Sequence, residues 1–93
     1  MPLFQFRKSR PGRPVVFYTR QGCHLCDDAV GLLRQYERTF RLEITIVDID
    51  SDPALAARYG DKVPVVVIDG RERFFGQVDG ALLRRVLRAA PKK

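Results

Sequence analysis

The sequence predicts an α/β domain in which helices cover both faces of a four-stranded mixed sheet. A helical pattern lies between two β-branched runs, which is typical of a β-α-β unit with parallel strands and a right-handed crossover. Further along, Asp69-Gly70 separates two short stretches that we expect to be strands, and this dipeptide favours a two-residue antiparallel hairpin. With one helix before the hairpin and one after it, the predicted order is β-α-β-α-β-β-α.

The first β-α-β unit is predicted from residue periodicity. Residues 14–18 and 42–49 are rich in β-branched and aromatic side chains, as strands are. Between them we expect a helix from Cys23 to about Phe40, because apolar residues recur there with helical spacing. Its apolar stripe consists of Leu25, Ala29, Leu32, Leu33, Tyr36 and Phe40.

The second half is predicted from capping and turn residues. Asp52-Pro53 has the pattern of a helix N-cap followed by proline at the first helical position. Residues 64–68 and 71–75 form the expected hairpin strands. Asp79 can cap a last helix, whose apolar face is Leu82, Leu83, Val86 and Leu87 and whose charged face is Arg84, Arg85 and Arg88.

Length and charge indicate one small domain with basic tails. The 93 residues allow a single core, which we place at residues 14–90, with irregular tails at 1–13 and 91–93. Six of the 17 basic residues lie in or beside these tails, and the 11 that remain equal the 11 acidic residues. The domain is therefore formally neutral, and we expect no nucleic-acid partner. The tails are expected to be solvated segments.

The sequence also allows a prediction of the protein's cellular location. It has no apolar run long enough to span a membrane, and its start lacks the apolar core of a secretory signal. We therefore expect a cytoplasmic protein without a membrane partner, and a monomer.

The most informative feature is Cys23-His24-Leu25-Cys26, which contains the only two cysteines. Two cysteines three residues apart, where a strand leads into a helix, are typical of dithiol oxidoreductases. Their Cβ atoms would lie about 5–6 Å apart on a helix, so a small adjustment closes or opens a disulfide. The unpaired N–H groups of a helix N-terminus favour a thiolate at Cys23. The adjacent His24 could also favour the thiolate if it is protonated or donates a hydrogen bond.

The cysteine pair is also compatible with a structural role or with metal binding. It could be a structural disulfide or two inert core thiols, although a four-residue loop gives a disulfide only about 2 kcal/mol of stabilisation. Cys23, His24 and Cys26 could also supply three metal ligands, whereas a structural zinc site uses four. No second cysteine pair exists to complete such a site, and we expect no bound metal.

The chain resembles the thioredoxin superfamily, and most closely the small glutaredoxin-like proteins with a C-x-L-C active site. The resemblance covers residues 14–90 and rests on three stretches, residues 17–26, 47–53 and 58–65, which read FYTRQGCHLC, VDIDSDP and RYGDKVPV. It implies the minimal thioredoxin fold and the activity of a thiol–disulfide oxidoreductase. An alternative of another class is a redox-sensing or interaction module with little turnover.

The resemblance also implies roles for individual residues. Cys23 corresponds to the nucleophile and Cys26 to the resolving thiol of a redox-active disulfide. Val63-Pro64 matches the hydrophobic residue and cis-proline that bind substrate. Arg20 stands where many glutaredoxins carry a lysine, so it is a candidate for thiolate tuning or for contact with a glutathione carboxylate.

The implied partners are a disulfide-containing protein or a glutathione mixed disulfide, together with an unidentified reductase. No tightly bound cofactor is implied, and glutathione is a candidate reductant or co-substrate. Two departures from the pattern stand out. Phe17 occupies the position of an aspartate that thioredoxins bury, and Gly76-Gln77-Val78-Asp79 matches the glutaredoxin Gly-Gly-x-Asp motif only in part.

Overall fold

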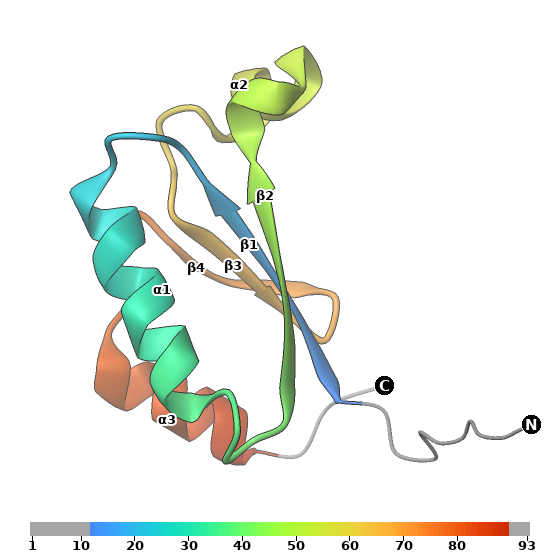
Figure 1. The fold of residues 1–93 in the computed structure, drawn as a ribbon, viewed down its shortest axis with the longest axis vertical. Helices are drawn as coiled ribbons and strands as arrows, with labels where there is room; N and C mark the ends of the chain where they lie inside the picture. Colours follow the sequence, from blue (N-terminus) through green and yellow to red (C-terminus); the bar gives the residue numbers. More distant parts are fainter. Residues whose placement is uncertain (1–11, 90–93) are drawn as a thin grey trace, which may run out of the picture.

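The computed structural model describes residues 12–89, and its fold is shown in Figure 1. The elements in chain order are β1 (Arg13–Thr19), α1 (His24–Tyr36), β2 (Leu42–Asp48), the 3-10 helix η2 (Ile49–Ser51), α2 (Pro53–Tyr59), β3 (Val65–Ile68), β4 (Arg71–Phe75) and α3 (Gly80–Arg88). The predicted α/β class and the predicted order of strands and α-helices are confirmed. No helix within residues 12–89 combines the length and the apolarity that crossing a membrane requires.

The four strands form one mixed sheet in the order β2-β1-β3-β4. β1 pairs with β2 in parallel, with Val15 opposite Ile44. β3 pairs antiparallel with both β1 and β4, and a bulge interrupts the β3–β4 register between Val66 and Val67. The helix-linked strands are therefore parallel and the hairpin-linked strands antiparallel, as expected.

The hydrophobic core consists of two clusters, one on each face of the sheet, because successive side chains of a strand point to opposite faces. The larger cluster lies between the sheet and helices α1 and α3, which Figure 1 shows on the same side. Its fully buried members include Val15, Phe17, Leu33, Val66 and Leu83. The smaller cluster lies on the opposite face, where α2 and η2 pack Tyr59 and Ile49 against Val65, with Tyr18 partly buried beside them.

The hairpin between β3 and β4 has the backbone that its sequence predicts. Asp69 and Gly70 both have positive φ angles, 53° and 82°. Two consecutive positive φ angles define the type I′ turn, which matches the twist of antiparallel strands. Asp69 also accepts a salt bridge from Arg13 at 2.6 Å, so the hairpin is fixed to the start of β1.

Several expected boundaries differ from the observed ones. β1 and β2 were expected over residues 14–18 and 42–49, but they span Arg13–Thr19 and Leu42–Asp48. The tail was expected to include residue 13, but Arg13 begins β1, where its guanidinium bonds Asp69 and the carbonyl of Leu87. Residues 1–11 of that tail and the tail at 91–93 lie outside the described residues, whereas the N–H of Gly12 bonds Glu43 at 3.0 Å. β3 begins at Val65 and not at Pro64, whose nitrogen has no hydrogen to donate to the sheet.

The first helix was expected to reach Phe40, but α1 ends at Tyr36. Residues 37–40 form turns, and Arg41 adopts a left-handed conformation with φ 56° that redirects the chain into β2. The N–H of Leu42 closes this reversal by bonding the carbonyl of Glu37 at 2.9 Å. The apolar stripe continues past the helix because Tyr36 and Phe40 still pack edge to face, with ring centroids 5.8 Å apart.

Candidate redox site

The two cysteines are joined by a disulfide at the start of α1. Their Cα atoms are 5.2 Å apart, which is within the normal range for a disulfide. The bond closes a loop of only four residues, so opening it releases very little chain. The pair can therefore change redox state without unfolding the domain.

Cys23 is the N-cap of α1 and therefore lies at the positive end of the helix. The turn before it passes through Gly22, whose φ of 78° favours glycine. Cys23 itself is extended (φ −96°, ψ 104°), and its Sγ accepts a hydrogen bond from the backbone N–H of Cys26 at 3.1 Å. Sulfur thus occupies the place that a serine or aspartate oxygen takes at most helix N-termini. A negative charge on this sulfur would strengthen the same hydrogen bond.

The two sulfurs differ in exposure. Cys23 is partly exposed, whereas Cys26 is 1% exposed and packs in the larger core cluster. Phe17, at the position of the thioredoxin aspartate, is equally buried, and no polar or charged residue within residues 12–89 is classed as buried. Cys26 therefore has no buried carboxylate to act as its base.

The loop before β3 is held beside the end of β4. The N–H of Gly76 donates to the carbonyls of Lys62 (2.8 Å) and Pro64 (3.0 Å), and the Val63–Pro64 peptide bond is cis. Val63 is partly buried against the core cluster that contains Cys26, and Cys23 packs against the same cluster. Within the described residues, no hydrogen bond uses the backbone of Val63, so its N–H and C=O remain available to a ligand.

Arg20 is occupied by an ion pair. Its guanidinium donates to both carboxylate oxygens of Asp50, at 3.0 and 2.9 Å, and to the carbonyl of Gly60 at 3.0 Å. The hydrogen bond between them raises the pKa of Arg20 and lowers the pKa of Asp50. These contacts join the end of β1 to η2 and to the end of α2. A role for Arg20 toward the thiolate or glutathione stays a prediction.

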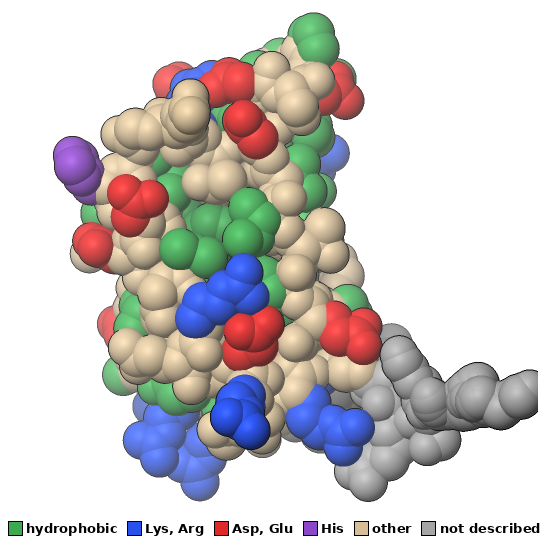
Figure 2. Space-filling view, viewed as in Figure 1, with side chains coloured by type: hydrophobic (Ala, Val, Ile, Leu, Met, Phe, Trp, Pro, Cys, Tyr) green, Lys and Arg blue, Asp and Glu red, His purple; other side chains and the backbone are tan. Residues whose placement is uncertain are grey.

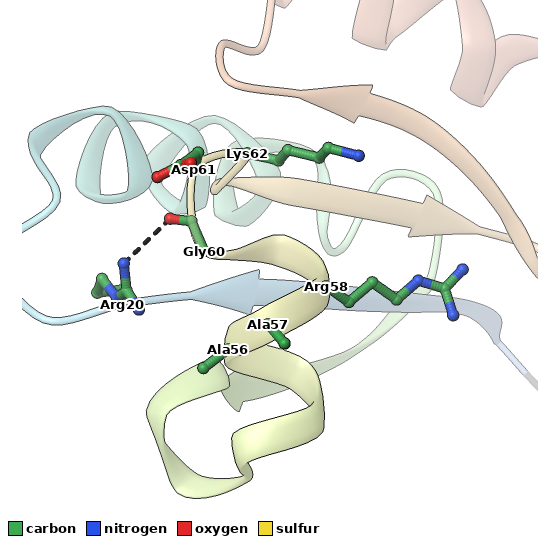
Figure 3. Close-up of a pocket in the computed structure, with 7 residues that line it drawn as sticks. All are labelled: Arg20, Ala56, Ala57, Arg58, Gly60, Asp61 and Lys62. Carbon is green, nitrogen blue, oxygen red and sulfur yellow. Dashed lines mark hydrogen bonds between the residues drawn. The ribbon is translucent and has the colours of Figure 1, made fainter.

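An open pocket of about 470 Å³ lies beside this ion pair. It is lined by Arg20, Ala56, Ala57, Arg58, Gly60, Asp61 and Lys62. In Figure 3, Arg20 points to Gly60, while the side chains of Arg58 and Lys62 extend away from it. The three cations therefore do not converge on one point of this pocket.

His24 is the first residue of α1, and its side chain is exposed. This side chain makes no hydrogen bond or ion pair with another described residue, so a role for His24 in tuning Cys23 stays a prediction. In the part of the chain that the structure describes, no three His, Cys, Asp or Glu side chains are grouped so that they could hold a metal ion.

Comparison with known families identifies the domain. Residues 14–88 match the model of the glutaredoxin-like domain (DUF836). The chain belongs to this glutaredoxin-like family. Uncharacterized proteins of Mycobacterium tuberculosis and Mycobacterium bovis are each 35% identical to it over 81 residues, which span 82% of this chain and 81% of the relative.

Solved structures agree with the family and the fold. The target protein XcR50 from X. campestris is 40% identical with a TM-score of 0.67, and the match covers 83% of this chain and 99% of that protein. Protein Ne2328 from Nitrosomonas europaea is 27% identical, with a TM-score of 0.66 and coverage of 87% and 98%. A mutant thioredoxin from Halobacterium salinarum is 19% identical, with a TM-score of 0.67 and coverage of 89% and 78%, and it shows the thioredoxin fold alone.

Sequence reasoning missed two residues around the site of this glutaredoxin-like domain. Asp50 was recognised only as part of the stretch 47–53, although an acidic residue after a parallel strand is well placed to meet Arg20 after the neighbouring strand. Gly76 was recognised only after the expected strand 71–75 and in the partial match to the glutaredoxin Gly-Gly-x-Asp motif. Its φ of 81° and its two hydrogen bonds show that it also fixes the loop at Val63-Pro64.

Proposed function

We propose that this glutaredoxin-like protein is a thiol–disulfide oxidoreductase in which Cys23 is the nucleophile and Cys26 the resolving thiol. The hydrogen bond from the Cys26 N–H to the Cys23 Sγ at 3.1 Å carries the proposal. This hydrogen bond would stabilise a thiolate on Cys23, which is the more exposed of the two sulfurs. The family match and the paired cysteines support a thiol redox role more generally.

The reaction begins with the reduced pair. The Cys23 thiolate attacks one sulfur of a substrate disulfide, forming a Cys23–substrate bond while the substrate S–S bond breaks. The other substrate sulfur leaves as a thiolate. Partial exposure of Cys23 permits this attack, whereas the burial of Cys26 prevents it from competing.

Cys26 then resolves the mixed disulfide. Its sulfur attacks the Sγ of Cys23, the Cys23–Cys26 disulfide forms, and the second substrate sulfur leaves as a thiol. Because no buried carboxylate lies beside Cys26, its proton passes to the leaving substrate sulfur or to solvent. Two electrons move from the cysteine pair to the substrate, and a thiol reductant returns them in the next cycle.

Substrate binding is proposed to use the backbone of Val63. Its N–H and C=O bond no other described group, and an extended peptide could pair with them as an added strand. Such pairing would place a peptide disulfide near Cys23 and would supply rate through orientation. The proposed substrates are protein disulfides or glutathione mixed disulfides.

The proposed setting is the cytoplasm, where reductants keep thiols reduced. An unidentified reductase or glutathione would restore the dithiol, and no tightly bound cofactor takes part in this scheme. Arg20 and His24 are the candidates for contact with glutathione or for tuning the thiolate. Comparing turnover with glutathione and with a thioredoxin reductase as the electron source would identify the reductant.

Trapping of the intermediate tests the mechanism. Cys26→Ser should accumulate a mixed disulfide with a disulfide-containing protein, because nothing remains to resolve it. Cys23→Ser is the matched control and should trap none. Trapping by Cys23→Ser in place of Cys26→Ser would reverse the assignment of roles. Reversible formation of the Cys23–Cys26 bond without catalytic reduction of insulin would favour the redox-sensing module.

A further inference from the structure

The acidic and basic residues of the domain are equal in number, but they are concentrated toward opposite ends of the molecule. Acidic side chains gather around the Cys23 end of the fold: Asp27, Asp28, Asp48, Asp50, Asp52 and Asp61. Arginines gather where α1 and α3 end: Arg34, Arg38, Arg84, Arg85 and Arg88. Figure 2 shows this pattern, with Lys and Arg gathered at the lower end and mostly Asp and Glu in the upper half.

The arginine-rich end contains two neighbouring hollows. One, of about 480 Å³, is lined by Gln35, Tyr36, Thr39, Phe40, Arg84 and Arg88, and we call its lining residues the α1–α3 surface. The other, of about 300 Å³, is lined by Ala81, Arg84, Arg85 and Arg88. Arg84 and Arg88 line both hollows, so the two hollows are neighbours on this face of α3.

The arginines of the α1–α3 surface are not used by the fold. The side chains of Arg84 and Arg88 are exposed and make no ion pair or hydrogen bond with another described residue. By contrast, Arg13 and Arg34 nearby are paired with Asp69 and Glu37. Residues four apart lie on the same side of a helix, so the two guanidinium groups can bind successive oxyanions of one ligand.

Aromatic rings form the opposite side of this hollow. Tyr36 and Phe40 are partly exposed and pack edge to face with each other. Gln35 and Thr39 add polar side chains that can donate or accept hydrogen bonds. Arginine forks beside aromatic rings suit a ligand that carries both phosphates and flat rings.

More positive charge continues from the same end of the molecule. Arg13 bonds the carbonyls of Leu87 and Ala89, so the first and last described segments meet there, as Figure 1 shows. The sequence beyond these two points adds Arg7, Lys8, Arg10, Lys92 and Lys93 and no acidic residue. Positive charge in these flanking residues adds long-range attraction for a ligand with many negative charges.

We propose that the α1–α3 surface binds single-stranded nucleic acid, with Arg84 and Arg88 on successive phosphates and a base against Tyr36 or Phe40. An acidic protein would match the charges but not the aromatic wall, and an anionic membrane offers no flat rings. The ends of α1 lie roughly 18 Å apart, so bound nucleic acid would leave Cys23 accessible. This proposal departs from the expectation of no nucleic-acid partner, which rested on a charge count without positions.

Fluorescence anisotropy of the full chain with labelled twelve-nucleotide oligo(U) and oligo(dT) tests this proposal. The variant Arg84→Gln/Arg88→Gln should weaken binding by about tenfold or more and reduce its salt dependence, because phosphate contacts are lost. Arg58→Gln/Lys62→Gln removes the same charge beside Asp61, at the acidic end, and should change affinity by less than about twofold. Glutamine is nearly as good a helix former as arginine, so α3 should persist.

Three outcomes would overturn the proposal. They are no binding at low salt, equal weakening by both double variants, or equal competition by poly-glutamate or by anionic phosphatidylserine vesicles. Tyr36→Leu keeps an apolar side chain but removes the ring, and it should also weaken binding if a base stacks there. Disulfide reduction by Arg84→Gln/Arg88→Gln should match the unmodified protein, which separates this surface from the redox site.

Discussion

The backbone N–H of Cys26 points at the Sγ of Cys23, 3.1 Å away. Cys26 is therefore the disulfide partner of Cys23, and its backbone N–H is also the group that the Cys23 sulfur caps. The arrangement exists because Cys23 is the N-cap of α1 and Cys26 lies three residues into that helix. Under the proposed mechanism, this hydrogen bond favours a thiolate at the first sulfur, whereas the second sulfur lies in the core.

The two thiols should react with alkylators at different rates. In the reduced protein at pH 6–7, iodoacetamide should label Cys23 well before Cys26, because the thiolate reacts and only Cys23 is partly exposed. Mass spectrometry of peptides over time measures both rates. Equal rates would contradict the assignment of Cys23 as the nucleophile.

The capping role of Cys23 can be measured apart from its redox role. In a Cys26→Ser background, which cannot form the disulfide, Cys23→Ser should keep an N-cap acceptor and Cys23→Ala should lose it. We expect the alanine variant to be less stable by about 1 kcal/mol, which is typical of a lost N-cap. Urea unfolding of the two variants gives the difference. Equal midpoints would show that an N-cap acceptor at position 23 contributes no stability.

The Arg20–Asp50 ion pair should make stability depend on pH in the acid range. The hydrogen bond from Arg20 lowers the pKa of Asp50 below its ordinary 3.8. Its contribution is therefore complete above that value and is lost as the pH falls through the lower pKa of the folded state. Asp50→Asn should be less stable than the unmodified protein at pH 6, and the gap should shrink as the pH falls below 3.8.

The control for this prediction is Asp52→Asn, which changes a nearby carboxylate without an arginine partner. Asp52 is the N-cap of α2 and accepts a hydrogen bond from Ala54, and asparagine can cap a helix equally well. Its stability gap should therefore stay small at every pH. A gap for Asp50→Asn that is constant from pH 6 to pH 2 would contradict a stabilising role for the ion pair.

Tyr59 should lose a proton only above its ordinary pKa. Burial, together with the hydrogen bond to Glu72 at 3.0 Å and the charge of that carboxylate, raises the pKa of the phenol above 10.0. A raised pKa stabilises the fold below pH 10 and loses that effect as the pH rises through the folded-state value. Absorbance near 295 nm should show one tyrosine that ionises late, and Tyr59→Phe should remove that component.

Much of the fold and the centre of the site could be predicted because their signals are local. The type I′ turn needs two neighbouring residues that tolerate positive φ, and Asp69-Gly70 provides them. The Cys23–Cys26 pair needs only a three-residue spacing and a helix that begins there. Asp79 likewise caps α3 through N–H groups two and three residues away.

The tertiary structure decided the features that depend on residues distant in sequence. The end of α1 was missed because Phe40 keeps its core contact after the helix has stopped, so the apolar spacing continues where the regular helix gives way to turns. Arg20 had no visible partner in the sequence, since Asp50 reaches it only when β1 and β2 pair in parallel.

The charge of the protein could also be predicted only in part from the sequence. The sequence by itself determined the balance between acidic and basic residues, but not their positions. The fold brings the ends of α1 and α3 together, so that Arg84, Arg88 and Tyr36 line the same hollow. A sum over a sequence contains no distances, and the electrostatic field of a protein depends on distance.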